Sequence, residues 1–317
     1  MSVVVYVESQ NGLIKKAGLE VASYGRAIAN ATNTSLIAVT FNTNDSSVLN
    51  SHGVDKVYNI NTAGDSFFNV DRYSASLVPI IEKEEASIVV VSATADGRYL
   101  GPILAVGAQA AYFSNVVALP SSYAPLTVKR SCFTNKAFNE SVSNQSKAVI
   151  CLSSNAFGLK EQTSNAENLE GEYLVSNSTL KVTAVDKVTD KVTIADADIV
   201  VSGGRGLKGP ENWHLIEDLA AVLGAATACS KPVSDMGWRP HSEHVGQTGK
   251  PVASNLYIAI GVSGAIQHLA GINSSKIKVV INNDPEAPFF KAADYGIVGD
   301  AFEVVPKLIQ KLRAIKQ

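Results

Sequence analysis

The sequence has few cysteines, no long apolar run and no excess of charge of either sign. Its three cysteines, Cys132, Cys151 and Cys229, are far apart and form no CxxC pair. We therefore expect neither a disulfide framework nor a zinc site, and a reducing compartment fits best. Lysine and arginine number 27 against 29 aspartates and glutamates, a net charge of −2. This balance gives no electrostatic reason to expect a nucleic acid or an anionic membrane as partner.

No segment contains the ~20 consecutive apolar residues that a membrane-spanning helix needs. The first residues, Met1–Glu8, lack the basic start of a signal peptide, and we expect them to hold a strand. The sequence therefore predicts a cytoplasmic protein without membrane insertion. With 317 residues, 46% apolar and 18% charged, it is typical of a globular protein of about two domains.

The first half alternates expected strands with expected helices. Strands are predicted at Val3–Val7, Leu36–Thr40 and Ser87–Ser92, and helices at Lys15–Ala31 and Tyr73–Lys83. This alternation predicts a parallel sheet with helices on both faces.

The amino-acid composition changes near residue 116, where prolines and β-favouring stretches begin. We interpret Leu126–Phe133, Ala137–Val142 and Lys147–Leu152 as antiparallel strands that extend the first sheet. We expect Asn155–Asn168 to be a polar loop and Tyr173–Asp190 an extended connector.

The second half resumes the α/β rhythm, so we predict two domains, 1–188 and 189–317. It has about five expected strands joined by glycine-containing turns. These strands are Asp198–Val201, Ala225–Cys229, Leu256–Ile260, Lys278–Ile281 and Ile297–Gly299.

Gly204-x-Gly206-x-x-Gly209 follows an expected strand and precedes an expected helix, which formally matches the dinucleotide fingerprint. The acidic residue that would bind the ribose is missing, because the next strand ends at Cys229-Ser230-Lys231. An ordinary NAD site is therefore disfavoured. An arginine inside such a turn is nevertheless well placed to bind a phosphate.

His241 and His244 lie three residues apart, but no third metal ligand follows at a suitable spacing. We interpret them as surface-loop histidines and expect no metal site. Val245-Gly246-Gln247-Thr248-Gly249 is typical of a simple turn, although its glycines would let the backbone approach a flat ligand. The sequence shows no nucleophile elbow, Walker loop or paired carboxylates, so hydrolytic chemistry has no candidate residues.

The stretch Leu256–Asp284 reads as a strand, a glycine turn, a short helix and a second strand. Ligands of open α/β sheets lie beyond the carboxyl ends of such strands, and a helix start suits a phosphate. Polar side chains from several loops would converge at this edge. This set, Arg205, Lys231, Thr248, Gln267 and His268, suits a diphosphate with a heteroaromatic ring, so a dinucleotide is the expected ligand.

Four segments resemble the electron transfer flavoprotein α subunit: SGGRGLKGPENW, VGQTGK, LYIAIGVSGAIQHLAGI and VVINNDPEAPFFKAADYGIVGD. The resemblance is dense over 198–315, whereas the first half matches mainly in length and α/β pattern. It implies an N-terminal nucleotide-hydrolase-like parallel sheet with added antiparallel strands. It also implies a C-terminal deacetylase-like parallel sheet that binds FAD.

The resemblance implies roles for individual residues. Arg205 would contact the diphosphate, the Thr248 hydroxyl would lie near flavin N5, and His268 would face the flavin O2 edge. Reduction puts negative charge on that edge, so an imidazole donor there would be stabilising. The complete implied set of FAD-binding residues is Arg205, Ser230, Lys231, Val245, Gly246, Gln247, Thr248, Ser263, Gly264, Ala265, Ile266, Gln267, His268, Asn282, Asp300 and Ala301.

Lys231 departs from the resemblance, because the family commonly has an arginine at this position, over the flavin. Lysine keeps the charge but lacks the planar group that stacks on a ring. We therefore expect the flavin potential to differ from that of better-known members.

The resemblance implies an electron carrier without a substrate of its own. It would accept electrons from flavoprotein dehydrogenases, such as the acyl-CoA dehydrogenases of fatty acid β-oxidation, and pass them to a membrane quinone oxidoreductase. A β subunit carrying AMP or a second FAD would complete a heterodimer. Three alternatives stay open: a bifurcating carrier that oxidises NADH, a dinucleotide-dependent enzyme of the same fold, and an adenine-nucleotide sensor built on the first domain.

Overall fold

The computed structural model of the chain describes residues 1–316 apart from 63, 66, 134, 176–177, 186–192 and 195–196. The described residues form two compact units. The first comprises 1–132 and 138–187, and the second comprises 188–317 together with 133–137. The expected domain boundary, between 188 and 189, lies outside the described residues.

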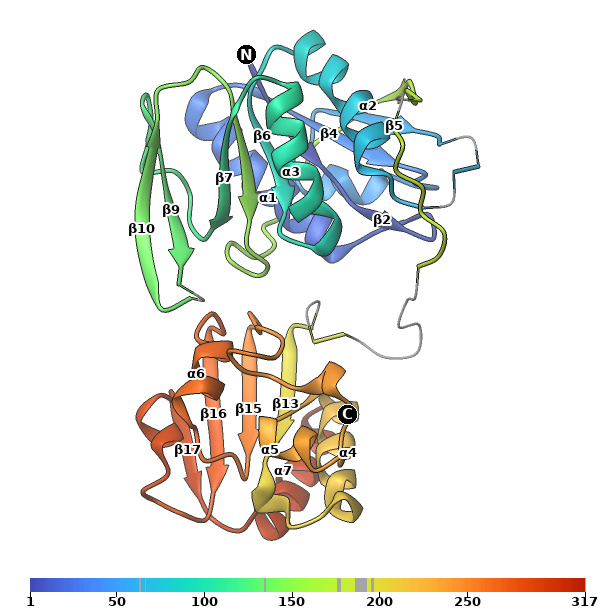
Figure 1. Cartoon of the computed structure of the whole chain (residues 1–317). Helices are drawn as coiled ribbons and strands as arrows, with labels where there is room; N and C mark the ends of the chain where they lie inside the picture. Colours follow the sequence, from blue (N-terminus) through green and yellow to red (C-terminus); the bar gives the residue numbers. More distant parts are fainter. Residues whose placement is uncertain are drawn as a thin grey trace. The chain divides into compact units, whose positions relative to one another are not determined.

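The first unit contains most of the strands (Figure 1). In chain order its elements are β1 (Ser2–Tyr6), β2 (Ser9–Gln10), β3 (Leu13–Ile14), α1 (Lys16–Thr32), β4 (Ser35–Phe41), η1 (Ser47–Ser51), β5 (Lys56–Ile60), α2 (Val70–Lys83), β6 (Ala86–Ser92), α3 (Ala95–Gly107), β7 (Ala111–Val116), β8 (Ser122–Tyr123), β9 (Leu126–Cys132), β10 (Ala137–Ser143), β11 (Ala148–Leu152) and β12 (Glu167–Gly171).

The main sheet of this unit has the order β10-β9-β7-β11-β6-β1-β4-β5-β12, with β8 paired to β9. From β7 to β12 neighbouring strands are parallel, and β9 joins β7 antiparallel. Successive side chains of β1 point to opposite faces of the sheet, and all five residues of the strand are buried. Val3 and Val5 pack in the cluster that includes α1, and Val4 packs in the cluster that includes α2 and α3.

One sequence interpretation of this unit is wrong, and one strand was missed. The segment at 147–152 is not an antiparallel extension, because β11 lies inside the sheet and runs parallel to β6 and β7. Its five residues AVICL are all buried, as expected of a strand covered on both faces. The expected polar loop at 155–168 contains no helix or named strand up to residue 166. It is followed by β12, a strand that was not predicted and that pairs parallel with β5 at the sheet edge.

The second unit is a smaller α/β layer. Its elements are β13 (Ile199–Gly203), η2 (Arg205–Leu207), η3 (Pro210–Trp213), α4 (His214–Leu223), β14 (Ala226–Cys229), α5 (Lys231–Asp235), η4 (His241–Glu243), β15 (Leu256–Ile260), α6 (Ile266–Ile272), β16 (Ile277–Asn282), η5 (Pro288–Lys291), β17 (Tyr295–Val298) and α7 (Ala301–Lys316).

Its strands form one five-stranded sheet in the order β14-β13-β15-β16-β17. Every neighbouring pair is parallel, so the predicted second parallel sheet of about five strands is confirmed. Because all strands point the same way, their carboxyl ends lie along one edge. Loops that follow different strands are therefore brought together there.

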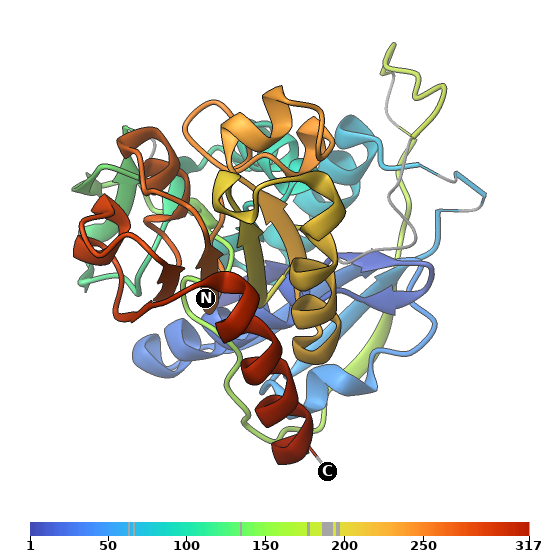
Figure 2. The same ribbon diagram turned by 90° about the horizontal axis from the view of Figure 1, so that it is seen from below.

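Each face of this sheet has its own apolar core. On one face α4 and α7, drawn side by side in Figure 2, bury Trp213, Ile216 and Val305 against the strands. Burial of such a side chain stabilises the fold by roughly 1.5–3 kcal/mol. The other face is covered by the loop around Val245 and by residues near α6, with Phe289 fully buried among them. Within the described residues, none of the helices is both long and apolar enough to cross a bilayer.

Candidate functional site

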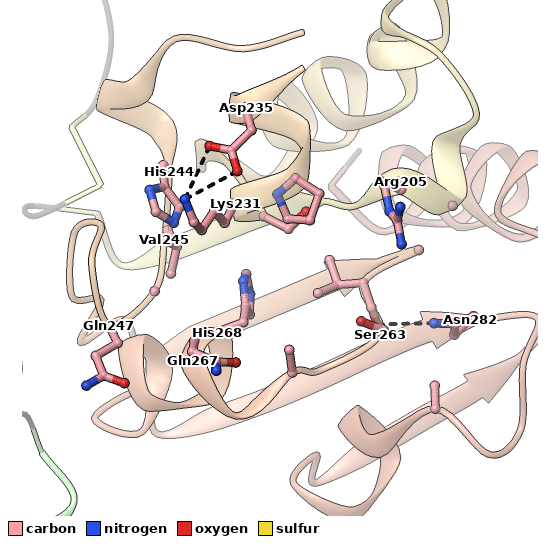
Figure 3. Close-up of a pocket in the computed structure, with 18 of the residues that line it drawn as sticks. Arg205, Lys231, Asp235, His244, Val245, Gln247, Ser263, Gln267, His268 and Asn282 are labelled. Atoms are coloured by element: carbon pink, nitrogen blue, oxygen red, sulfur yellow. Dashed lines mark hydrogen bonds and ion pairs between the residues drawn. The ribbon is translucent and has the colours of Figure 1, made fainter. Parts of the chain in front are cut away.

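A cavity of about 610 Å³ lies beyond the carboxyl ends of β13, β14, β15 and β16. Its volume is within the range of small-molecule and cofactor sites. Figure 3 shows Gln247 and Arg205 at opposite ends of the group of lining side chains, with His268 between them. An elongated ligand would suit this arrangement.

Most of the site residues singled out in the sequence line this cavity. The turn after β13, the start of α5, the loop before β15 and the turn after β15 each contribute some of them. The residues brought together are Arg205, Ser230, Lys231, Val245, Gly246, Gln247, Thr248, Ser263, Ala265, Gln267, His268 and Asn282.

Four of the singled-out residues are not among the lining residues. Ile266 is 77% exposed, and Gly264 packs against the Phe289 backbone. Asp300 caps α7, because its Oδ1 accepts from the Phe302 N–H at 2.9 Å. Ala301 opens α7 and is buried in its core cluster. The structure therefore gives Asp300 and Ala301 a local role in starting a helix.

Backbone hydrogen bonds continue past the strand ends and hold the loops around the cavity in register. The N–H of Gly204 donates to the Ile260 carbonyl at 2.9 Å, and that of Gly206 to the Gly261 carbonyl at 3.1 Å. The N–H of Gln247 donates to the Gln267 carbonyl at 2.7 Å. The cavity wall is thus built by paired backbone rather than by free loops.

Glycine allows the turns after β13 and β15 to touch. A Cβ atom at Gly204 would lie 2.1 Å from the Gly261 carbonyl oxygen, and one at Gly206 2.7 Å from the Gly261 Cα. Gly261 itself has φ +63°, a conformation that other residues rarely adopt. Only glycine fits this close approach, so the fingerprint glycines have a packing role that does not require NAD.

His268 lies in the centre of the site and is uncharged near neutral pH. It is 6% exposed, and burial, aided by the nearby His244, lowers its pKa to about 4. Its Nε2 lies 2.9 Å from the Tyr257 hydroxyl, while no described residue hydrogen-bonds to its buried Nδ1. A neutral ring of this kind acts on a ligand through a hydrogen bond and not through a full charge.

Two cations border the cavity in different ways. Lys231 opens α5, and its Nζ lies 3.3 Å from Asp235 Oδ2 one helical turn later. Arg205 is exposed in the turn after β13, and no described residue forms an ion pair with it. The guanidinium of Arg205 is therefore available to a phosphate, whereas the ammonium of Lys231 already has a carboxylate partner.

The interpretation of His244 as a surface-loop residue is wrong. His244 is 2% exposed and lines the cavity, because its backbone pairs with Cys229 at the end of β14. Asp235 and Asp284 also line the cavity and were missed. Direct adjacency to the glycine loop at 245–249 was the available signal for His244. Among the described residues, no group of three or more His, Cys, Asp or Glu side chains could hold a metal ion.

Comparison with known proteins agrees with this geometry. The Electron transfer flavoprotein domain family matches residues 3–172, and the Electron transfer flavoprotein FAD-binding domain family matches residues 193–273. The electron transfer flavoprotein subunit alpha of Bacillus subtilis is 35% identical, over 99% of this chain and 98% of its own length. The chain belongs to the electron transfer flavoprotein α-subunit family.

Two further members of this family are similar over nearly their whole lengths. The subunit alpha of Syntrophomonas wolfei is 33% identical, over 98% of both chains. That of Thermoanaerobacterium thermosaccharolyticum is 31% identical, also over 98% of both chains. The family assignment therefore covers both units of this electron transfer flavoprotein α-subunit homologue.

FAD is the cofactor of the second unit, since the family that matches residues 193–273 is the FAD-binding domain. The residues present fit this group. Glycine turns expose backbone at the cavity, no described residue forms an ion pair with Arg205, and the buried Nδ1 of His244 has no hydrogen-bond partner among the described residues. Buried polar atoms without partners are uncommon in folded proteins and call for an explanation, such as a ligand.

Proposed function

We propose that the chain is the FAD-bearing subunit of an electron-carrying heterodimer. It would accept electrons from flavoprotein dehydrogenases, such as the acyl-CoA dehydrogenases of fatty acid β-oxidation, and deliver them to a membrane quinone oxidoreductase. The observation that carries this proposal is the cavity at the carboxyl edge of the second sheet. Its lining combines a free guanidinium with a neutral imidazole, as an anionic cofactor with a redox-active ring requires.

We assign the cofactor's parts to the two ends of the cavity. The diphosphate would lie at Arg205 and the turn that includes Ser263, where a forked cation and backbone N–H groups suit phosphate oxygens. The flavin ring would lie between Lys231 and the loop with Gln247 and Thr248. FAD supplies the redox chemistry, and the chain's own residues bind it and set its surroundings.

His268 would act as a neutral hydrogen-bond donor toward the flavin edge that gains negative charge on reduction. Such a donor stabilises the developing charge without charge–charge repulsion against nearby cations. The buried Tyr257 hydroxyl would hold the ring in place through its contact with Nε2, 2.9 Å away. Asn282 would position the turn at Ser263, because its Nδ2 donates to the adjacent Val262 carbonyl at 3.1 Å.

A β subunit would be the obligatory partner, carrying AMP or a second FAD. The names of the relatives as subunits support this assignment. The first unit would pair with that subunit. The connector predicted near 176–195 lies partly outside the described residues.

The test is to co-express the chain with a β subunit from the same organism and to count FAD per heterodimer. We expect one FAD, reducible by an acyl-CoA dehydrogenase with its substrate and not by NADH. Two FAD molecules and rapid reduction by NADH would instead establish the bifurcating alternative. A protein that turns over NAD without bound flavin would overturn both.

A further inference from the structure

His244 is held rigidly at the cavity by its backbone. The N–H of the next residue, Val245, donates to the Cys229 carbonyl at 3.0 Å, and the His244 carbonyl accepts from the Lys250 N–H at 2.8 Å. The residue is therefore tied to the end of β14 on one side and to its own loop on the other. Its imidazole has little freedom to leave the site.

Two glycines make room for the His244 ring. A Cβ atom at Gly249 would lie 2.9 Å from the ring Cγ, and one at Gly246 would lie 3.4 Å from Nε2. The ring thus fills a space that glycine leaves open. Its buried Nδ1 finds no hydrogen-bond partner in the described part of the chain, although an unpaired buried polar atom costs stability. A polar group retained under these conditions suggests a function.

Charged and titratable groups face His244 from each element packed around it. The His241 ring centroid lies 5.1 Å away. Burial is the largest cause that lowers the pKa of His244, followed by His241 and Lys231, while Asp235 raises it. The surrounding groups are His241 and Glu243 on η4, Lys231 and Asp235 on α5, His268 on α6, and Cys229, with its pKa raised to about 12, on β14.

We propose that His244 is the proton-responsive group of the flavin site, neutral beside the oxidised cofactor and protonated when negative charge accumulates there. The electron comes from the donor protein and resides on the flavin, and the proton comes from solvent and stays on the imidazole. One negative and one positive charge therefore enter the site together. The inference rests on FAD binding and would hold whichever proteins donate and accept the electrons.

The sign of the effect follows from linkage. Burial and the neighbouring His241 and Lys231 hold the pKa of His244 below its ordinary value of 6.5, so the ring is neutral at pH 7. Negative charge added to the cavity favours the protonated ring, and by reciprocity the protonated ring favours the reduced cofactor. For groups separated by a few ångströms in a protein interior, this coupling is on the order of tenfold.

The experiment compares flavin midpoint potentials between pH 5 and 8 in the FAD-loaded heterodimer, using mediator dyes. The variants are His244→Gln, which cannot titrate, and His241→Gln, which removes the neighbouring loop histidine. The potential of the wild type should exceed that of His244→Gln increasingly as the pH falls. At the acid end the difference should reach about tenfold in the one-electron equilibrium, or ~59 mV. The His241→Gln profile should keep an inflection, moved to higher pH, because His241 is one of the groups that lower the pKa of His244.

Parallel profiles for the wild type and His244→Gln would overturn the proposal, as would loss of the inflection in His241→Gln alone. A second measurement uses only the wild-type protein, so it does not depend on whether a variant still binds FAD. In wild-type protein with ¹⁵N-labelled histidine, the His244 ring should titrate at higher pH with reduced flavin than with oxidised flavin, and an unmoved midpoint would also overturn it. Failure of a dehydrogenase to reduce the protein would refute only the carrier function, because mediator dyes bypass that step.

Discussion

Both units place buried polar side chains at the carboxyl edge of a parallel sheet, and they treat those side chains in opposite ways. In the first unit Glu8, two residues beyond β1, is 2% exposed. Its carboxylate accepts from Ser92 at 2.8 Å and from Thr94, and pairs with Lys15 at 3.4 Å. In the second unit the imidazoles of His244 and His268 line a cavity, and no described residue accepts or donates a hydrogen bond at their Nδ1 atoms under the same distance and angle limits.

The difference shows what makes such an edge a ligand site. Burial raises the pKa of Glu8, but hydroxyls and an ammonium of the protein offset that cost, so no ligand is required to satisfy the carboxylate. That carboxylate would also repel a phosphate next to the start of α3, which disfavours a nucleotide sensor at this edge of the first unit. In the second unit the polar groups are left for a ligand to satisfy.

The largest effect should come from Gly204→Ala, which disrupts the contact between two cavity loops at the carboxyl edge of the second sheet. The new methyl group would lie 2.1 Å from the Gly261 carbonyl oxygen, so the turns after β13 and β15 must separate. We expect FAD affinity to fall at least on the order of 100-fold, as is usual when site geometry is displaced. Titration of the FAD-free heterodimer with FAD, followed by flavin fluorescence, measures it.

Gly224→Ala is the matched control for this substitution. Gly224 ends α4 with φ +67°, and a Cβ there would meet nothing within 4 Å. The backbone strain should cost roughly 1 kcal/mol of stability while FAD affinity stays unchanged. Equal loss of FAD in both variants would show that general destabilisation, and not the contact between the two turns, controls binding.

The next largest effect should come from Glu8→Ala, which removes the buried carboxylate at the carboxyl edge of the first sheet. This change leaves Ser92, Thr94 and Lys15 without their common acceptor in a buried place. We expect the free energy of unfolding of the first unit to fall by about 3 kcal/mol, with FAD content unchanged below the melting temperature. Thermal unfolding followed by circular dichroism checks this. Exposed Glu167→Ala should change stability by less than about 0.5 kcal/mol.

His268→Ala tests the second edge without changing its shape greatly. Loss of the neutral donor should lower the flavin midpoint potential by about tenfold in the one-electron equilibrium, or ~59 mV. The fold should stay intact, because the imidazole makes few polar contacts: a hydrogen bond with the Tyr257 hydroxyl and an interaction with the Val245 backbone. Exposed His214→Ala should leave the potential unchanged, and a potential in His268→Ala equal to that of the wild type would refute the assigned role.

Local patterns were sufficient to predict the strands of the second unit. β15 runs from Leu256 to Ile260 as expected, because a short apolar run between turn signals has few alternatives. The converging loops were also predictable, since parallel strands place their carboxyl ends at one edge. In the first unit, β11 has the same apolar character, but apolar character does not encode strand direction or position in the sheet.

Long-range pairing explains the remaining errors. β12, with the sequence ENLEG, has no strand-like pattern and exists because its backbone pairs with β5. The burial of His244 depends on Cys229, whose backbone lies far away in the sequence.

The smallest expected effect concerns Lys231, the cation at the cavity that already pairs with a carboxylate of the protein. Its ammonium lies 3.3 Å from Asp235, and both side chains are 58% exposed, so solvent weakens the pair. Lys231→Arg keeps the charge and adds a planar group that can stack on the flavin. We expect the flavin midpoint potential to rise by an amount equivalent to roughly two- to fivefold in the one-electron equilibrium constant, well below the effect of His268→Ala.

Spectroelectrochemistry of the two holoproteins measures this difference in potential. Asp235→Asn is the control, because it frees the ammonium of Lys231 without adding a planar group. If Asp235→Asn raises the potential as much as Lys231→Arg does, charge alone explains the effect. If Lys231→Arg has no effect, the planar group adds nothing, and the expected difference from family members with arginine at this position is refuted.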